Sequence, residues 1–237
     1  MSASLVLHIA GVSKTYGGLR PLRIDELRVS AGDRVALLGL DQAMAEVLVN
    51  LITGAAVPDQ GALTVFGRPT TAIAGAEEWL AVVDRFGIVS ERAVLLEGLT
   101  AIQNLSLPFT VEIEPPSAEV RARASALARE AGLSEAEWDA PVGALAALSR
   151  TRLRIARAIA LDPAILVLEH PTATVGPEEG PVLARLVASI AARRKLTIVA
   201  ITADRAFGEA LGARTLTLDP ASGRLADRRG WFGLRGR

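Results

Sequence analysis

The chain has 237 residues, no cysteine, and equal numbers of acidic and basic side chains, 26 of each. Half of the residues are apolar, so the chain can bury a sizeable core and a disordered chain is excluded. The composition also excludes disulfides and cysteine zinc sites, and the balanced charge gives no reason to expect a nucleic acid partner. With no signal peptide and no membrane-spanning apolar run in view, we expect a cytoplasmic protein.

The first third of the chain predicts short strands, turns and helices in close succession. Apolar runs and turn residues mark the strands, and apolar spacing of three to four residues marks the helices. In chain order we expect strands at 5–10, 24–29 and 34–39, a helix at 43–52, a strand at 62–66, a helix at 77–84 and a strand at 85–89. A turn is expected at Gly17–Gly18 and another at Pro58–Gly61.

The middle of the chain, residues 98–150, is predicted to be helical. Its strongest element is an amphipathic helix at 119–131, with Ser117 placed to cap it and Glu119 in its first turn. The last third predicts a helix at 152–160, a strand at 165–168, a helix at 178–192 and a strand at 197–201. This alternation favours an α/β domain with a mostly parallel sheet covered on both faces. We interpret residues 98–150 as an inserted helical subdomain and 227–237 as a basic tail.

One stretch has the form of a phosphate-binding loop without its chemistry. A buried strand, a tight turn at Gly39 and a helix lead to Gly54. The working motif G-x-x-x-x-G-K-[ST] uses glycines to bring backbone N–H groups to phosphate, lysine to neutralise it, and a hydroxyl to bind magnesium. At the last three motif positions this chain has Met44, Ala45 and Glu46.

The order of elements over residues 5–226 resembles the ATP-binding cassette (ABC) ATPases. The segments that carry the resemblance are 11–16 (GVSKTY), 50–54 (NLITG), 58–61 (PDQG), 155–163 (IARAIALDP), 166–172 (LVLEHPT) and 216–225. The resemblance implies a P-loop NTPase fold of the ABC-ATPase type as one domain over 1–226, with an antiparallel β-subdomain at the N-terminus. It also implies ATP and Mg²⁺ as cofactors, a membrane permease and a second cassette as partners, and a place on the cytoplasmic face of the inner membrane.

The resemblance also assigns nucleotide-binding positions. These are Tyr16, Gly39, Asp41, Ala45, Glu46, Val47 and Glu91. Tyr16 keeps the aromatic ring that stacks on adenine. Gln42 and Met44 stand at glycine positions, Ala45 at the lysine and Glu46 at the magnesium-binding hydroxyl. Glu91 follows a strand where the family has glutamine.

The remaining motif positions are altered as well. The LSGGQ signature of the family aligns with Leu145, Ala146, Ala147, Leu148 and Ser149; a gapped alignment beginning at Leu148 is the alternative. Glu169 replaces the Walker B aspartate, and His170 replaces the catalytic glutamate. Gly176 stands at the aspartate of the D-loop, and Ala203 at the switch histidine. Of these positions, only Glu46, Glu91 and Glu169 offer carboxylates to a metal.

Three functional hypotheses follow from these substitutions. The first is a degenerate cassette that serves as a structural or regulatory subunit of a bacterial ABC transporter and does not hydrolyse ATP efficiently. The second is a working ATPase with atypical motifs, in which Tyr16, Glu46, Glu91 and Glu169 hold Mg-ATP. The third is a soluble module outside transport that uses the fold as a binding platform.

Overall fold

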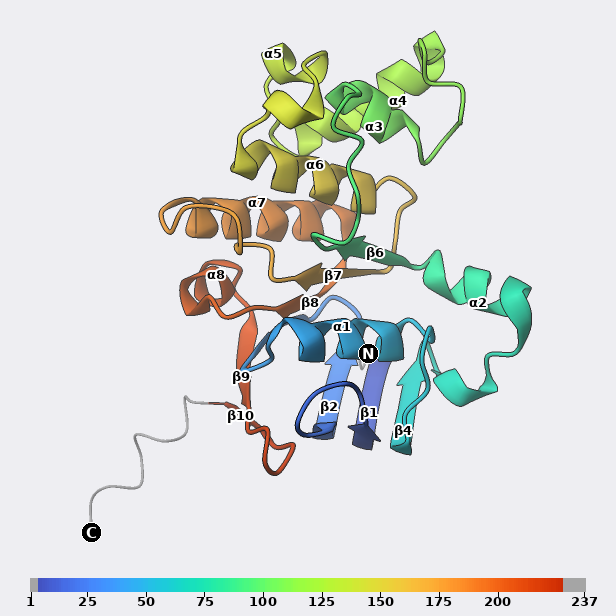
Figure 1. Ribbon diagram of the computed structural model, residues 1–237, viewed down its shortest axis with the longest axis vertical. Coiled ribbons are helices and arrows are strands. Elements are labelled where there is room, and N and C mark those ends of the chain that lie inside the picture. Colours follow the sequence, from blue (N-terminus) through green and yellow to red (C-terminus); the bar gives the residue numbers. More distant parts are fainter. Residues whose placement is uncertain (1–3, 228–237) are drawn as a thin grey trace.

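The computed structural model describes residues 4–227, and it contains two sheets on either side of a helix (Figure 1). The first sheet is antiparallel, in the order β2-β1-β4-β5. It consists of β1 (Leu5–Lys14), β2 (Leu22–Ser30), β4 (Gln60–Val65) and β5 (Arg68–Pro69). The second sheet has the order β10-β9-β3-β8-β7-β6, and its strands pair in parallel except for β10. Its strands are β3 (Arg34–Leu38), β6 (Phe86–Val89), β7 (Ile165–Glu169), β8 (Thr197–Ile201), β9 (Arg214–Leu218) and β10 (Leu225–Asp227).

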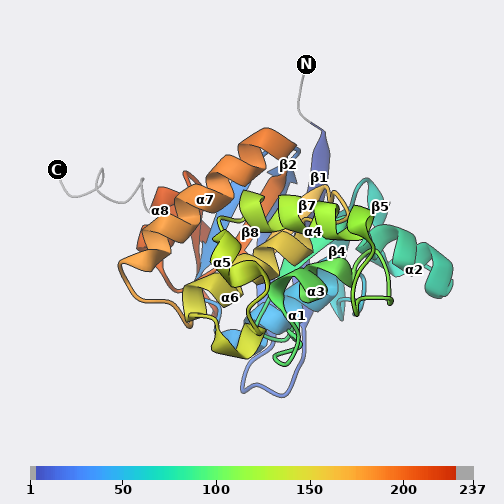
Figure 2. The ribbon, with the colours of Figure 1, turned by 90° about the horizontal axis from the view of Figure 1, so that it is seen from above.

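α6 and α7 cover one face of the second sheet and α1 covers the other (Figure 1), and from above the helices overlie the strands (Figure 2); this confirms the expected fold class. They are α1 (Gln42–Ile52), α2 (Gly75–Val83), α3 (Ala101–Ser106), α4 (Ala118–Glu130), α5 (Glu135–Trp138), α6 (Ala147–Ala158), α7 (Glu179–Arg194) and α8 (Arg205–Ala210). Short 3₁₀ turns occur at Thr70–Ala72 and Val142–Ala144. Among residues 4–227, no helix is long and apolar enough to cross a membrane.

Alternation along the central strands produces two separate cores. Successive side chains of a strand point to opposite faces of the sheet. On β7, Leu166 and Leu168 therefore pack with α6 and α7, while Ile165 and Val167 pack with α1 and the antiparallel sheet. All four side chains are fully buried. This two-sided burial explains why β7 is a continuous apolar run rather than an alternating one.

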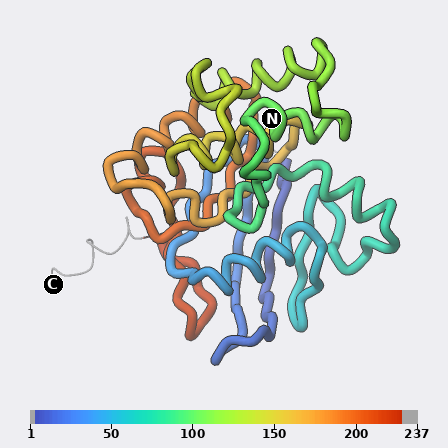
Figure 3. Tube along the Cα trace, turned by 45° about the horizontal axis from the view of Figure 1, so that its top comes forward, coloured from blue at the N-terminus to red at the C-terminus, as the bar shows by residue number. Residues whose placement is uncertain are grey.

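The chain leaves the second sheet after β6, forms the helical part of the molecule and returns to the sheet at β7 (Figure 3). We refer to α3, α4 and α5, residues 101–138, as the helical layer. α3 packs on α4, and both contact α6, which in turn packs on β6. α6 is thus the connection between the helical layer and the sheet.

The predicted elements are found close to their expected bounds, with one clear correction. Ser117 caps α4 by accepting a hydrogen bond from the backbone N–H of Val120. The helix expected at 152–160 instead begins at Ala147; Ser149 in its first turns is buried and donates a hydrogen bond to Glu137, so this stretch is packed rather than lying in a loop. Residues 228–237 of the predicted basic tail lie outside the described residues.

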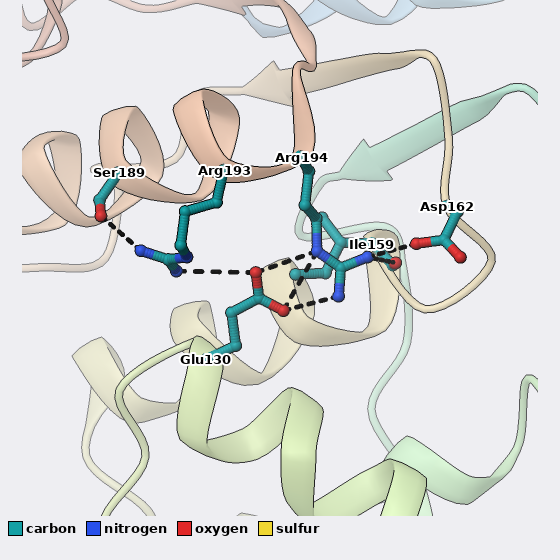
Figure 4. A network of polar contacts seen from close by, with 6 residues as sticks. All are labelled: Glu130, Ile159, Asp162, Ser189, Arg193 and Arg194. Atoms are coloured by element: carbon teal, nitrogen blue, oxygen red, sulfur yellow. Dashed lines mark hydrogen bonds and ion pairs between the residues drawn. The ribbon is translucent and has the colours of Figure 1, made fainter.

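A network of ion pairs ties the helical layer to α7 (Figure 4). The Arg194 guanidinium donates to both carboxylate oxygens of Glu130, at 2.6 to 3.1 Å, and to the Ile159 carbonyl at 3.0 Å. Arg194 also pairs with Asp162, and Arg193 lies 3.6 Å from Glu130. The network joins the C-terminal ends of α4 and α7 with the turn after α6.

We expect this network to contribute a pH-dependent part of the stability. Hydrogen bonding and charge from Arg194 hold the pKa of Glu130 below its ordinary value of 4.5. A lowered folded-state pKa stabilises the fold above the unfolded pKa, and this contribution is lost as the pH falls through the folded-state value. The free energy of unfolding of the wild type should therefore exceed that of Glu130→Gln by a constant amount above roughly pH 6, and the difference should shrink below about pH 4.5. Urea unfolding at several pH values measures it; a difference that does not change with pH would contradict the assignment.

Candidate functional site

The amino end of α1 is the place where the family resemblance puts the phosphate site. Gly39 directly follows β3 with a φ of 86°, and an added Cβ there would lie 2.9 Å from the Leu218 carbonyl oxygen. Asp41 then caps α1, because its carboxylate accepts the backbone N–H of Met44 at 2.8 Å. A carboxylate thus already occupies part of the helix end where backbone N–H groups and the helix dipole attract anions.

Arg92 holds two carboxylates together beside this helix end. Its guanidinium donates to Glu169 at 2.7 Å and pairs with Glu46 at 3.1 Å. Glu169 also accepts a hydrogen bond from the side-chain amide of Gln42, the first residue of α1. The Glu169 side chain is fully buried, whereas that of Arg92 is 39% exposed. The resulting cluster joins α1, the end of β7 and the segment after β6.

The charge of Arg92 is stabilised by this arrangement. Burial alone would lower the pKa of its guanidinium, but the hydrogen bond to Glu169 and the charges of Glu169 and Glu46 raise it above the ordinary value. Sequence reasoning did not find Arg92. Its position next to Glu91 gave no indication of this role, because its partners Glu46 and Glu169 lie on other elements. A buried carboxylate needs a cation or several hydrogen bonds; Arg92 supplies the cation and one hydrogen bond, and Gln42 supplies another.

Glu91 points away from this cluster. It accepts two hydrogen bonds from the guanidinium of Arg154 on α6, both at 2.8 Å, and a longer one from the Thr174 hydroxyl. The three carboxylates predicted as metal ligands therefore do not come together: Glu46 and Glu169 share Arg92, and Glu91 is paired elsewhere. Among residues 4–227 there is no group of three or more His, Cys, Asp or Glu side chains arranged for a metal ion.

Tyr16 lies beside an open pocket at the amino end of α1. The pocket has a volume of about 610 Å³. It is lined by Tyr16, Gly17, Gly18, Leu19, Arg20, Asp41, Ala43 and Met44. Burial, and then the charge of Asp41, raise the pKa of the Tyr16 hydroxyl. The structure thus brings together Tyr16 and Asp41, two of the positions that the resemblance assigns to nucleotide.

Ala45 and Val47 follow Asp41 on α1 and complete the aligned set. Ala45 is fully buried in the core beneath the helix, while Val47 packs at its margin. An alanine that faces the core leaves no side chain at the surface of the loop. At the position where the family has lysine, this chain therefore has a buried methyl group and no charge.

The aligned signature segment lies at the start of α6. Ala146 is the N-cap residue, Ala147 and Leu148 begin the helix, and Leu145 is buried in front of it. Ala146 has no side-chain oxygen with which to cap the helix. The Ser149 hydroxyl is buried and donates to the Glu137 carboxylate within the helical part of the molecule. Ser149, the serine of the alternative, gapped alignment, therefore already has a hydrogen-bond partner within the chain.

The positions of the catalytic glutamate, the D-loop aspartate and the switch histidine follow β7 and β8. His170 has a φ of 44°, and its backbone N–H donates to the Ile201 carbonyl at 2.8 Å. In the described part of the chain, its buried Nε2 atom has no hydrogen-bond partner. The backbone N–H of Gly176 donates to Glu179, and Ala203 is exposed at the end of β8.

Comparison with known sequences identifies relatives along most of the chain. The profile of the family described as ABC transporter matches residues 22–173. The methionine import ATP-binding protein MetN of Caulobacter vibrioides is 32% identical over 218 residues, which cover 91% of this chain and 64% of that protein. MetN of Brucella abortus is 27% identical, with 90% and 57% covered. The lipoprotein-releasing system protein LolD of Coxiella burnetii is 28% identical, with 92% and 95% covered. The chain thus spans less than two thirds of these MetN proteins.

Solved structures with the same fold include two cassettes. A dimeric, post-hydrolysis form of the ATP-binding cassette MJ0796, bound to ADP and Pi, superposes with a TM-score of 0.74 at 22% identity, covering 92% of this chain and 96% of that one. CbiO1 of Clostridium perfringens, part of the ABC transporter complex CbiONQ, gives a TM-score of 0.79 at 19% identity, with 98% and 92% covered. At these identities the likeness shows the fold.

Proposed function

Because this chain belongs to the ABC transporter family, whose profile matches residues 22–173, we propose that it is a cassette subunit with a structural or regulatory role that does not hydrolyse ATP efficiently. The observation that carries the proposal is the charge at the amino end of α1. Arg92 pairs there with two carboxylates, Glu46 and Glu169, and a third carboxylate, Asp41, caps the same helix.

This arrangement does not fit the Mg-ATP that the family implies. Arg92 already pairs with the two carboxylates that would hold a metal, which leaves the group with a net negative charge, and Ala45 contributes no charge to a triphosphate. An opposite charge at about 4 Å contributes roughly 4 kcal/mol at an effective dielectric constant of about 20. This chain lacks that attraction at position 45 and adds the repulsion of Glu46. Stacking of adenine on Tyr16 contributes too little to offset both the lost attraction and the added repulsion.

The proposed partners are a membrane permease and a second cassette, which would hold the chain at the cytoplasmic face of the inner membrane. A groove between β6 and α6 supports the proposal of a permease partner. It has a volume of about 350 Å³ and is lined by Val83, Asp84, Phe86, Gly87, Ile88, Ala93, Pro108, Arg157, Ala158, Leu161 and Pro163. Arg157 donates to the Val94 carbonyl at 2.7 Å but has no carboxylate partner among residues 4–227. An apolar partner segment that carries an acidic side chain would fit this groove.

The proposal is tested by calorimetric titration of the chain with Mg-ATP, together with turnover assays alone and with the permease present. We expect no saturable binding at micromolar nucleotide and no turnover above background. Micromolar binding would contradict the proposal. So would turnover that is lost on Glu169→Ala or His170→Ala, because it would make the chain a working ATPase with unusual residues.

A matched variant makes a negative titration informative. The quadruple change Gln42→Gly, Met44→Gly, Ala45→Lys and Glu46→Ser restores the phosphate-binding motif on the same scaffold. Circular dichroism would first confirm that the variant folds. We expect this variant to bind Mg-ATP more tightly than the unchanged chain, because a lysine is long enough to bring its charge from position 45 to the loop and the glycines free the backbone N–H groups for phosphate. If neither protein binds, the four residues are not the cause of the loss.

A further inference from the structure

Two neighbouring side chains after β6 form ion pairs in opposite directions. Arg92 pairs with Glu169, the last residue of β7, and with Glu46 on α1. Glu91 pairs with Arg154 on α6. The Ser90 hydroxyl accepts the backbone N–H of Arg92 at 3.1 Å, which holds the segment in a local turn. This turn directs consecutive side chains to different parts of the molecule.

The pair on the α6 side is built as firmly as the pair on the sheet side. Glu91 and Arg154 form two parallel hydrogen bonds, both at 2.8 Å, and the Arg154 side chain is only 12% exposed. Bidentate pairs of arginine and carboxylate fix orientation as well as distance. Arg157, one turn further along α6, donates to the Val94 carbonyl and adds a third contact to the same stretch of chain.

α6 carries the helical layer, because α3 and α4 both pack on it. A segment that grips α6 on one side and the carboxyl end of β7 on the other therefore sets the angle between the helical layer and the sheet. The Glu130–Arg194 network makes a second attachment at the C-terminal end of α4 (Figure 4). Two attachments at different points, one on α6 and one at the end of α4, restrict rotation better than one.

We infer that residues 90–92 form a built-in clamp that holds the helical layer in one orientation against the second sheet, with Arg92 supplying the positive charge in the absence of nucleotide and metal. The clamp rests on the proposed function only in the claim that Mg-ATP does not displace it. The claim that the clamp forms without nucleotide depends only on the contacts of Glu91 and Arg92.

The absence of cysteine allows a direct test by spin labelling. Ala126 on α4 and Ala206 on α8 are exposed helical residues on either side of the boundary. With both changed to cysteine and labelled, pulsed electron paramagnetic resonance measures the distance between the layer and the sheet-bound helix. Without nucleotide or metal, we expect one narrow distance distribution.

Arg92→Gln and Glu91→Gln are the test variants in this labelled background. Each removes one side of the clamp, and we expect each to widen the distribution about twofold. Glu91→Gln leaves the buried Glu169 paired, so it remains informative even if Arg92→Gln folds poorly. Arg121→Gln is the matched control, because its pair with Asp139 lies at the helical layer alone. The control should leave the distribution unchanged.

The outcomes separate the clamp from the proposed function. A broad distribution in the unchanged chain, or no widening in either test variant, would overturn the clamp. A narrow distribution that Mg-ATP leaves in place supports both ideas. A narrow distribution that shifts on addition of Mg-ATP, with widening in the variants, supports the clamp and contradicts the proposed function.

Discussion

Arg92→Ala is expected to lower the free energy of unfolding by about 3 kcal/mol, since it leaves a buried carboxylate without its cation. Glu169 has a fully buried side chain and would retain the hydrogen bond from Gln42 alone among its side-chain partners. Urea unfolding followed by circular dichroism measures the effect. Arg28→Ala is the matched control, because both partners of the Arg28–Glu26 pair are about half exposed or more. The control should change stability by less than about 1 kcal/mol.

A double-mutant cycle identifies the cause of the loss. When Glu169 is changed to glutamine, the charge that needs Arg92 is gone, and Arg92→Ala should then cost much less. We expect a coupling free energy of at least about 1 kcal/mol between the two positions. Additive effects of Arg92→Ala and Glu169→Gln would mean that Arg92 stabilises the fold in another way, such as by packing its stem.

Gly87→Ala is expected to lower the free energy of unfolding by about 3 kcal/mol, at the upper end of what overpacking costs. An added Cβ on Gly87 would lie 2.3 Å from the Ala158 carbonyl oxygen at the end of α6, so β6 and α6 would have to separate. Urea unfolding measures the loss. The same substitution at Gly98 is the control, because an added Cβ there meets nothing within 4 Å. Gly98→Ala should stay within about 0.5 kcal/mol of the wild type, and equal losses at both sites would contradict the close contact.

Sequence patterns predicted the elements whose causes are local. β8 is found with its predicted bounds, and Ser117 caps α4 as expected, because a buried apolar run and a capping hydroxyl act over a few residues. α6 begins earlier than predicted because its first residues owe their helical state to tertiary packing. Ser149, for example, is buried there against Glu137.

The candidate site was predicted only in part, for the same physical reason. Alignment to the family identified Glu46 and Glu169, yet the residue that joins them is 77 positions from Glu169 in sequence. No local sequence pattern indicates which carboxylates Arg92 will pair with, because those carboxylates lie on other elements. Glu91 and Arg92 are chain neighbours with opposite charges, and a local interpretation would pair them with each other rather than with partners on different elements. Only the fold decides that they diverge.

Gly39 has a consequence for how such chains are recognised. Its positive φ and its contact with the Leu218 carbonyl are demands of the turn between β3 and α1 and of its packing against β9. Those demands persist whether or not phosphate is bound, because any side chain at this position would meet the neighbouring strand. The fold alone is therefore enough to require a glycine here. Its presence does not by itself indicate that a chain binds phosphate, whereas position 45, where the motif has lysine and this chain has alanine, bears directly on that question.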